Sequence, residues 1–249
     1  MFLAAHAKLN LDLRVLARRP DGRHEISSLI QAISLHDLLE MQAAAVTALE
    51  VTGFNAPVDE SNLVLKAVRA LEMAAGRALP ARFKLVKRIP LGSGLGGGSS
   101  DAAAALRGLC RLHGLAVDLA PIAAELGSDV PFFLNGGRAR AAGHGEQLEV
   151  VPDEAGWFAV ACPEIEVSTE EVYKRWDAIG GGPPNELQAA ALDLHPELAT
   201  FGERLGEGWQ LTGSGSAWFK PFGARPEAEA AARSAPGWTA VSWAVPRWA

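Results

Sequence analysis

The segment PLGSGLGGGSSDAAAAL, residues 90–106, is the part of the chain that decides the fold. Glycine fills five of the seven positions from 92 to 98, and after Ser-Ser-Asp four residues of alanine, the best helix former, follow at 102–105. The residues before it, 81–89, read as a strand. The residues after it begin a helix that we expect to run from Ser-Ser-Asp at 99–101 to about Gly114.

A strand, a glycine loop and a helix N-terminus in this order are typical of an anion cradle. Backbone amides without side chains can approach a phosphate, and the positive end of the helix favours it. A flexible connector is the alternative, but a linker is not usually placed between a strand and an alanine helix. We therefore predict a nucleotide phosphate site.

Residues that the segment lacks exclude several classes of nucleotide-binding loop. No lysine follows the glycines, which excludes a Walker A loop, and the sequence has no H-R-D or D-F-G of a protein kinase. Gly92, Gly94 and Gly97 do satisfy G-x-G-x-x-G, so a dinucleotide-binding oxidoreductase stays an alternative. That site needs an acidic residue about 20 positions further on, and the candidate, Asp118, reads instead as a helix cap.

Composition and charge exclude several classes of protein. With 49% hydrophobic and 21% charged residues, the 249-residue chain is expected to fold rather than be disordered. A net charge of −6 argues against a nucleic-acid platform. Cys110 and Cys162 have no metal-ligand spacing and are expected to pack in the core in a reducing compartment. The absence of a signal peptide or an apolar run of ~20 residues predicts a cytoplasmic protein without a membrane partner.

The rest of the chain predicts an α+β protein. Alternation from Lys8 to Val15 predicts a strand with Lys8 and Asn10 on one face. Later segments are expected to form strands at 26–40 and 46–54, a helix at 59–76 capped by Ser61 or Asn62, a helix at 118–127, a strand after Pro131, and a turn at 143–146. A change of pattern near 145–155 predicts two domains, residues 1–150 and 151–249.

The glycine segment resembles the ATP-binding motif of the GHMP small-molecule kinases, with Gly94, Leu95, Gly96, Ser99 and Ser100 at its centre. Four further segments support the resemblance in the family's order, namely AKLNL (7–11), RRPDGRHE (18–25), LGSDVPFFL (126–134) and LTGSGSAWF (211–219). Members of this superfamily join a ribosomal protein S5 domain 2-like N-terminal domain to a ferredoxin-like C-terminal domain. The resemblance is to the branch that phosphorylates a cytidine diphosphate-linked methylerythritol for non-mevalonate isoprenoid biosynthesis.

The resemblance implies two catalytic residues. Asp129, in GSDVP, is expected to accept the proton of the attacking hydroxyl, and Lys8 to supply the neighbouring positive charge. Taken alone, Asp129 reads as a turn aspartate and Lys8 as a solvated charge on a strand.

ATP is implied as the co-substrate, with Mg²⁺ carried mainly on its phosphates and on water, so that no metal-binding residue and no tightly bound cofactor are predicted. For Asn62, a plain helix-cap role is the alternative to a place beside the adenine. The residues implied to bind ATP are Asn62, Pro90, Leu91, Gly92, Ser93, Gly94, Leu95, Gly96, Gly97, Gly98, Ser99 and Ser100.

The implied substrate site lies elsewhere in the chain. His24 resembles a histidine that reads the cytosine edge, and Tyr173 resembles a stacking aromatic one helical turn after Thr169. Arg23 stands where the family commonly has a tyrosine, and a guanidinium plane can also stack on a base. Packing of Tyr173 and a plain hairpin turn at 213–215 are the structural alternatives. The residues implied to bind substrate are Asn10, His24, Thr169, Tyr173, Gly213, Ser214 and Gly215.

The sequence thus predicts ATP-dependent phosphorylation of the 2-hydroxyl of this cytidine diphosphate-linked substrate. A mevalonate-type or homoserine-type kinase of the same superfamily is the nearest alternative, and a non-catalytic nucleotide-binding protein is a more distant one. Nothing in the sequence indicates the oligomeric state.

Overall fold

A computed structural model describes residues 1–19, 22, 24–163 and 165–248 of the chain. Its contacts divide into two compact units. Unit 1 contains Met1–Ala7, His36–Leu91 and Gly96–Asn135, and unit 2 contains Lys8–Leu35, Gly92–Leu95 and Gly136–Ala249. Each unit is assembled from segments that are not consecutive, and the division into residues 1–150 and 151–249 stays a prediction.

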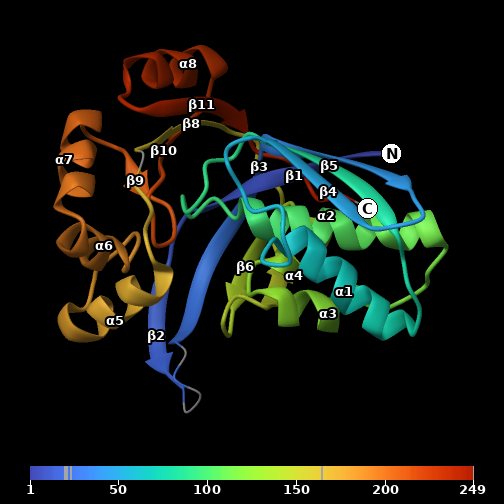
Figure 1. The fold of residues 1–249 in the computed structure, drawn as a ribbon. Helices are drawn as coiled ribbons and strands as arrows, with labels where there is room; N and C mark the ends of the chain where they lie inside the picture. Colours follow the sequence, from blue (N-terminus) through green and yellow to red (C-terminus); the bar gives the residue numbers. More distant parts are fainter. Residues whose placement is uncertain (20–21, 23, 164, 249) are drawn as a thin grey trace. The chain divides into compact units, whose positions relative to one another are not determined.

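Unit 1 is built on a parallel β-α-β connection (Figure 1). Strands β4 and β5 pair in parallel and α1 lies between them in the chain, as a parallel pair requires a crossover. The elements of unit 1 are β4 (Ala48–Gly53), α1 (Leu63–Ala75), β5 (Ala81–Lys87), α2 (Gly97–His113), α3 (Leu119–Leu126), α4 (Val130–Asn135), and parts of β1 (Phe2–Asn10) and β3 (His24–Ala43).

The core of unit 1 explains the alanine run of α2. Phe83 on β5 and Met41 on β3 are fully buried, and so are all four alanines at 102–105. A Cβ added at Gly108 of α2 would lie 2.6 Å from side-chain atoms of both Leu3 and Met41. Small residues therefore let α2 lie close to the strands and to its helical neighbours α1 and α4.

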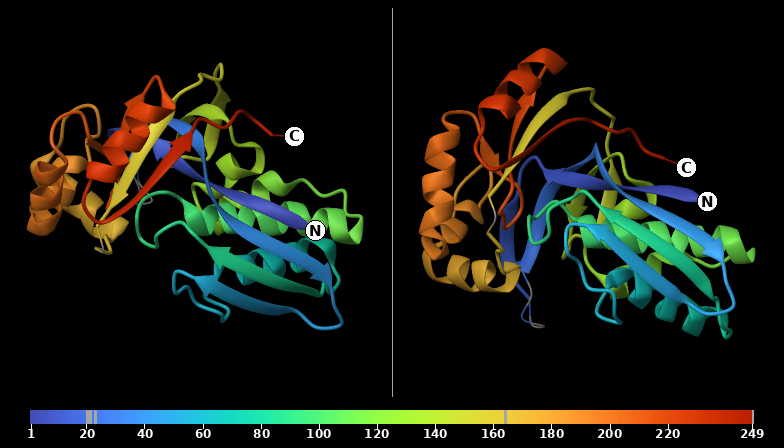
Figure 2. Two further views of the ribbon diagram at one scale, coloured as in Figure 1. Left: turned by 90° about the horizontal axis from the view of Figure 1, so that it is seen from above. Right: turned by 45° about the horizontal axis from the view of Figure 1, so that its top comes forward.

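Unit 2 contains an antiparallel sheet in the order β11-β8-β10-β9, and an antiparallel set in which β3 pairs with β2 and β6. Figure 2 shows the red helix α8 beside the yellow strand β8 and the red strand β11. The remaining elements of unit 2 are β2 (Arg14–Arg18), β6 (Arg138–Ala142), β7 (Gln147–Val150), β8 (Trp157–Cys162), α5 (Thr169–Ile179), α6 (Gln188–Leu194), α7 (Pro196–Leu205), β9 (Gln210–Leu211), β10 (Trp218–Phe222), α8 (Arg225–Ser234) and β11 (Trp238–Trp243).

The core of unit 2 joins α6 and α7 to the sheet. Ala161 of β8 and Leu211 of β9 pack with Leu198 and Phe201 of α7 and with Ala190 of α6. The hydroxyl of Ser242 on β11 bonds with the Ser34 hydroxyl at 2.9 Å and accepts the Leu35 amide at 2.8 Å. Both the apolar core and these buried polar bonds therefore support unit 2.

Most predicted elements form, and the α+β class is confirmed. Two predictions of secondary structure are wrong. The strand expected from Lys8 to Val15 is split into β1 and β2, because Asp12 turns toward β3 and its carboxylate accepts the Leu29 amide at 2.6 Å. The strand expected after Pro131 is helix α4, whose first turn tolerates a proline because that amide has no helical acceptor.

The two cysteines differ in burial. Cys162 lies in the core as predicted, whereas Cys110 is only half-buried because it lies near the end of α2, three residues before its last residue. Neither forms a disulfide. Over the residues that the structure describes, no helix has the length and the apolar character that a membrane crossing requires.

Candidate active site

The glycine loop has a backbone that other residues rarely adopt. Gly92, Gly94 and Gly96 have φ angles of +61°, +76° and +74°, in the left-handed region. A Cβ on Gly94 would lie only 2.7 Å from the carbonyl oxygen of Thr212 and 2.8 Å from that of Gly215. Within unit 2 the loop therefore lies directly against the second glycine turn, and Gly94 is required for this contact.

Helix α2 begins at the end of this loop, at Gly97, two residues earlier than predicted. Its cap is Gly96, which has no side chain to close the first turn, and the cap makes no side-chain hydrogen bond. The Ser100 amide is the first that bonds back along the helix, to Gly96 at 2.9 Å. The first amides of α2 thus lack helical acceptors and have the orientation that an anion site needs. Because Gly97 and Gly98 are already helical, Ser99 and Ser100 lie inside the first turn of α2 and not before it.

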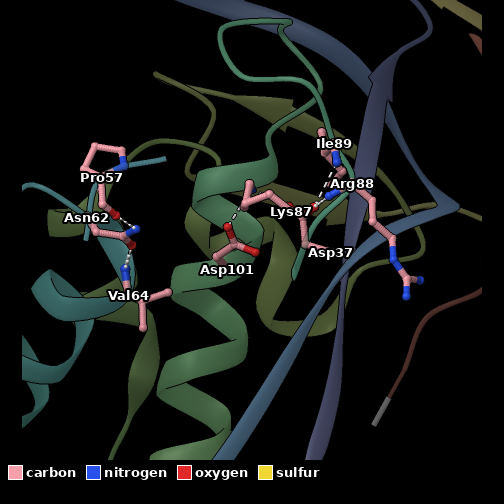
Figure 3. A network of polar contacts seen from close by, with 8 residues as sticks. All are labelled: Asp37, Pro57, Asn62, Val64, Lys87, Arg88, Ile89 and Asp101. Atoms are coloured by element: carbon pink, nitrogen blue, oxygen red, sulfur yellow. Dashed lines mark hydrogen bonds and ion pairs between the residues drawn. The ribbon is translucent and has the colours of Figure 1, made fainter. Parts of the chain in front are cut away.

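Three buried charged residues connect the two ends of the glycine loop in unit 1 (Figure 3). Lys87, at the end of β5, forms ion pairs with Asp37 of β3 and, at 2.7 Å, with Asp101 of α2. The other Asp37 oxygen accepts the amides of Arg88 and, at 2.8 Å, Ile89. This network was not predicted, because Asp37 lies 50 residues before its lysine and reads as an ordinary polar residue of a strand.

Burial changes the titration of this network. It raises the pKa of the Asp101 carboxyl to about 8, against the attraction of Lys87 and with added repulsion from Asp37. For Lys87 burial acts to lower the pKa, but the two carboxylates outweigh it and the pKa is raised. Oδ1 of Asp101 is buried and has no hydrogen-bond partner among the described residues. Burial thus favours the protonated form of Asp101, and the two carboxylates favour the charged form of Lys87.

Asn62 forms the helix cap that was one of its two predicted roles. Its side chain accepts the Val64 amide at 2.9 Å and donates to the Pro57 carbonyl at 2.6 Å (Figure 3). The next residue, Leu63, lies 3.3 Å from the position of a Cβ on Gly98. The start of α1 is thus beside the start of α2, and a contact of Asn62 with ATP stays a prediction.

Asp129 lies in unit 1, in the turn between α3 and α4. The preceding Gly127 is near the cradle, since a Cβ added to it would lie 4.0 Å from the Ser99 hydroxyl. Asp129 is half-buried. The structure therefore places the predicted base two residues from a glycine that adjoins the predicted phosphate-binding serine.

Lys8 and Asn10 lie together in unit 2, as the alternation predicted. Both are 5% exposed, and Lys8 Nζ donates to Asn10 Oδ1 at 2.5 Å. Asn10 is fixed further by its Nδ2, which donates to the Ser28 hydroxyl at 2.7 Å, and by its amide, which donates to the Thr212 hydroxyl at 2.8 Å. The Lys8 amide bonds to the carbonyl of Leu95 in the glycine loop at 2.9 Å. A buried lysine is thus held beside the loop in a definite position.

The second glycine motif is the turn of the hairpin β9–β10. A Cβ on Gly213 would lie 3.1 Å from Asn10 Oδ1 and 3.6 Å from Lys8 Nζ. The Ser214 hydroxyl hydrogen-bonds to the Thr169 hydroxyl at 2.8 Å. The hairpin turn that was the structural alternative is present, and it brings Gly213 to Lys8 and Asn10 and Ser214 to Thr169.

His24 and Tyr173 are also together, but in an arrangement that the sequence did not suggest. Their rings are stacked with centroids 4.9 Å apart and planes 14° apart. His24 Nε2 lies 2.6 Å from Oδ1 of Asp177, a residue that was not predicted. The one sequence feature that links Asp177 to this group is its position one helical turn after Tyr173 on α5. Arg23, predicted to stand in for a stacking tyrosine, lies outside the described residues.

The predicted site residues fall into two groups. Unit 2 brings together the substrate residues Asn10, His24, Thr169, Tyr173, Gly213, Ser214 and Gly215 with Lys8 and the loop residues Gly92, Ser93, Gly94 and Leu95. Unit 1 contains Asn62, Pro90, Leu91, Gly96, Gly97, Gly98, Ser99, Ser100 and Asp129. Their individual roles stay predictions.

The left-handed glycine loop and the uncapped start of α2 have the features of the anion site that a nucleotide-dependent kinase needs. Residues 62–137, which include the whole loop, match the family model described as the GHMP kinases N terminal domain. A solved mevalonate kinase from Methanococcus jannaschii, 13% identical, shares the fold with a TM-score of 0.66.

More similar proteins define the family within this class. The chain is 37% identical to the 4-diphosphocytidyl-2-C-methyl-D-erythritol kinase of Carboxydothermus hydrogenoformans, over 88% of this chain and 87% of that protein. Identity to the kinase of the same name from Pseudomonas syringae pv. tomato is 38%, over 92% and 88% of the two chains. A crystal structure of 4-(cytidine 5'-diphospho)-2C-methyl-D-erythritol kinase, 35% identical, matches 98% of this chain and 100% of its own with a TM-score of 0.83. The chain belongs to the 4-diphosphocytidyl-2-C-methyl-D-erythritol kinase family. It is a small-molecule kinase with ATP as its co-substrate.

Proposed function

We propose that this kinase transfers the γ-phosphate of ATP to the 2-hydroxyl of 4-diphosphocytidyl-2-C-methyl-D-erythritol. The observation that carries the proposal is identity of 37% to a kinase of that name over almost the whole length of both chains. The clustering of Lys8, Asn10, Thr169 and the 213–215 turn in one unit supports it from the geometry. The place of the enzyme is non-mevalonate isoprenoid precursor synthesis, and a cytoplasmic location stays a prediction.

Phosphoryl transfer requires the protein mainly to position the two reactants and to stabilise the charge of the transition state. The substrate oxygen forms a bond to the γ-phosphorus while the bond from that phosphorus to the β-γ bridging oxygen breaks, and ADP leaves. We assign to Asp129 the proton of the attacking hydroxyl. Lys8 stabilises the negative charge that develops on the attacking oxygen, and its hydrogen bond to Asn10 fixes its ammonium group before substrate binds.

The open amides at the start of α2 and the left-handed glycines are suited to the phosphates of ATP, because they present donors without side chains. We propose that Mg²⁺ enters with ATP and keeps most of its ligands from phosphate and water, as this ion usually does. Among the described residues, no three histidine, cysteine, aspartate or glutamate side chains are grouped so as to hold a metal ion. When bound, Mg²⁺ neutralises phosphate charge.

We assign recognition of the cytosine base to His24, and its contact with Asp177 supports a specific form of that role. We propose that Nε2 donates to the Asp177 carboxylate, 2.6 Å away, which leaves Nδ1 as the hydrogen-bond acceptor. An acceptor suits the exocyclic amino group of cytosine and repels the carbonyl that uracil has at the same place. Because His24 covers one face of Tyr173, a base that stacks on Tyr173 must use the other face.

Coupled ADP formation tests this function directly. We expect turnover with 4-diphosphocytidyl-2-C-methyl-D-erythritol and none with mevalonate, homoserine or galactose. Turnover of only one of these three alcohols would retain the GHMP class and reject the substrate. ATP binding without turnover of any substrate would favour the non-catalytic alternative.

A further inference from the structure

The Lys87 network differs from a simple surface ion pair in its burial and in joining three separate elements. Asp37 is fully buried, Asp101 is 2% exposed and Lys87 is 5% exposed. Its members come from β3, β5 and α2 (Figure 3). Removing one partner from such a group leaves another charge buried without compensation, which is strongly destabilising. The same cost opposes any movement that separates the three side chains.

The network joins the two ends of the glycine loop. On one side, Asp37 accepts the Arg88 and Ile89 amides, so it fixes the backbone that leads into Pro90. On the other side, Lys87 bonds to Asp101 in the second turn of α2. All of these residues belong to unit 1, and the segment between the two fixed ends is the glycine loop.

The ammonium group of Lys87 also lies behind the first turn of α2. A Cβ added to Gly97 would lie 3.2 Å from Lys87 Nζ and 3.1 Å from the Ile89 side chain. Gly97 is the first residue of the helix, and its amide is one of those without a helical acceptor. The lysine therefore packs against the first turn that presents the anion-binding amides.

We propose that Lys87, Asp37 and Asp101 are positioning residues for ATP: they hold the two ends of the glycine loop at the separation at which its amides bind the phosphates. The proposal rests on the proposed function in that the loop binds ATP. None of the three side chains needs to touch the nucleotide. Their effect is on the affinity for ATP, and the affinity for the alcohol substrate is independent of them.

The raised pKa of Asp101 supports this role. Burial favours the neutral form of Asp101, which adds no negative charge beneath a site for an anion. Asparagine in place of Asp101 keeps an oxygen that can accept from Lys87 and also has no charge. It is therefore the conservative replacement, whereas alanine removes the acceptor.

The experiment compares Asp101→Ala, Asp101→Asn and Lys87→Met with the wild-type chain, and uses Lys84→Met, an exposed lysine on the same strand, as the matched control. KM for ATP, KM for 4-diphosphocytidyl-2-C-methyl-D-erythritol and kcat are measured together with the dissociation constant of a non-hydrolysable ATP analogue. We expect Asp101→Ala to raise the KM for ATP and the analogue's dissociation constant about tenfold, because a loop that is no longer held must be ordered when the nucleotide binds. The KM for the alcohol should stay within about twofold, and Asp101→Asn and Lys84→Met should behave as wild type.

Three results would overturn the proposal: an unchanged KM for ATP in a folded Asp101→Ala variant, an equal rise of both KM values, or an Asp101→Asn variant as impaired as the alanine one. Lys87→Met leaves buried carboxylates without a cation and can fail to fold, so Asp101→Ala, which keeps the Lys87–Asp37 pair, is the deciding variant. If the wild-type chain binds the ATP analogue but does not turn over the substrate, the proposed function fails, and the binding measurements still decide the positioning role.

Discussion

Replacement of the buried Asp101 by asparagine should remove a pH dependence from the stability of the protein. Burial raises the pKa of this carboxyl from 3.8 to about 8, so the folded chain keeps a proton that the unfolded chain releases. Because the folded state binds more protons in this range, the free energy of unfolding falls as pH rises from about 4 to about 8. One proton corresponds to ~1.4 kcal/mol per pH unit. Between about pH 5 and about pH 7 the wild-type chain should therefore lose roughly 3 kcal/mol that the variant keeps.

The assay is urea unfolding, followed by far-UV circular dichroism at about pH 5, 6, 7 and 8. In the difference between the two free energies of unfolding, the contributions of the titratable groups that variant and wild type share cancel. Lys87 stays charged in this range, since its pKa is raised from 10.5. Asp153→Asn, at an exposed loop position, is the control and should run parallel to wild type. If Asp101→Asn also runs parallel to wild type over the whole range, Asp101 is ionised in the folded protein and the reasoning is wrong.

Three further variants test the site. Asp129→Asn should lower kcat by orders of magnitude and leave the affinity for an ATP analogue nearly intact, and turnover like that of wild type would remove Asp129 from the mechanism. Asp177→Asn removes the carboxylate that fixes which ring nitrogen of His24 carries the hydrogen. The preference for cytidine diphosphate over uridine diphosphate as a competing ligand should therefore fall about tenfold. An unchanged preference would exclude this role of Asp177. Gly94→Ala places a methyl group 2.7 Å from the Thr212 carbonyl at a positive φ, so we expect a loss of roughly 2 kcal/mol in urea unfolding. Wild-type stability would show that the loop can move away.

Local patterns predicted much of the fold because several of its signals are contained in short segments. Helix α1 has its cap at Asn62 and its left-handed end at Gly76, as the apolar spacing and these two residue types indicated. Asp118 caps α3 through the Ala120 amide, which agrees with its interpretation as a cap. The ends of such helices are determined by residues within the same short segment, so they can be predicted from the local sequence.

The remaining features depend on residues that are far apart in the chain. Val130–Asn135 is apolar enough for a strand, and only its packing in unit 1 selects a helix. The Asp37–Lys87 contact joins positions 50 residues apart. The same holds for His24 and Asp177, which are 153 residues apart. No periodicity or motif could have indicated these pairs, because each is made by the fold.

The alanine run of α2 also matters for laboratory evolution of this enzyme. All four residues at 102–105 are fully buried, so any larger side chain there must displace a neighbour, at a cost of about 1–3 kcal/mol. Since the first amides of the same helix are the ones we propose to bind the nucleotide, such a displacement would change donor angles at a distance from the mutated position. Libraries that seek a different phosphate donor should therefore leave these alanines fixed. Variation is better directed to exposed neighbours of the loop, where a new side chain has space.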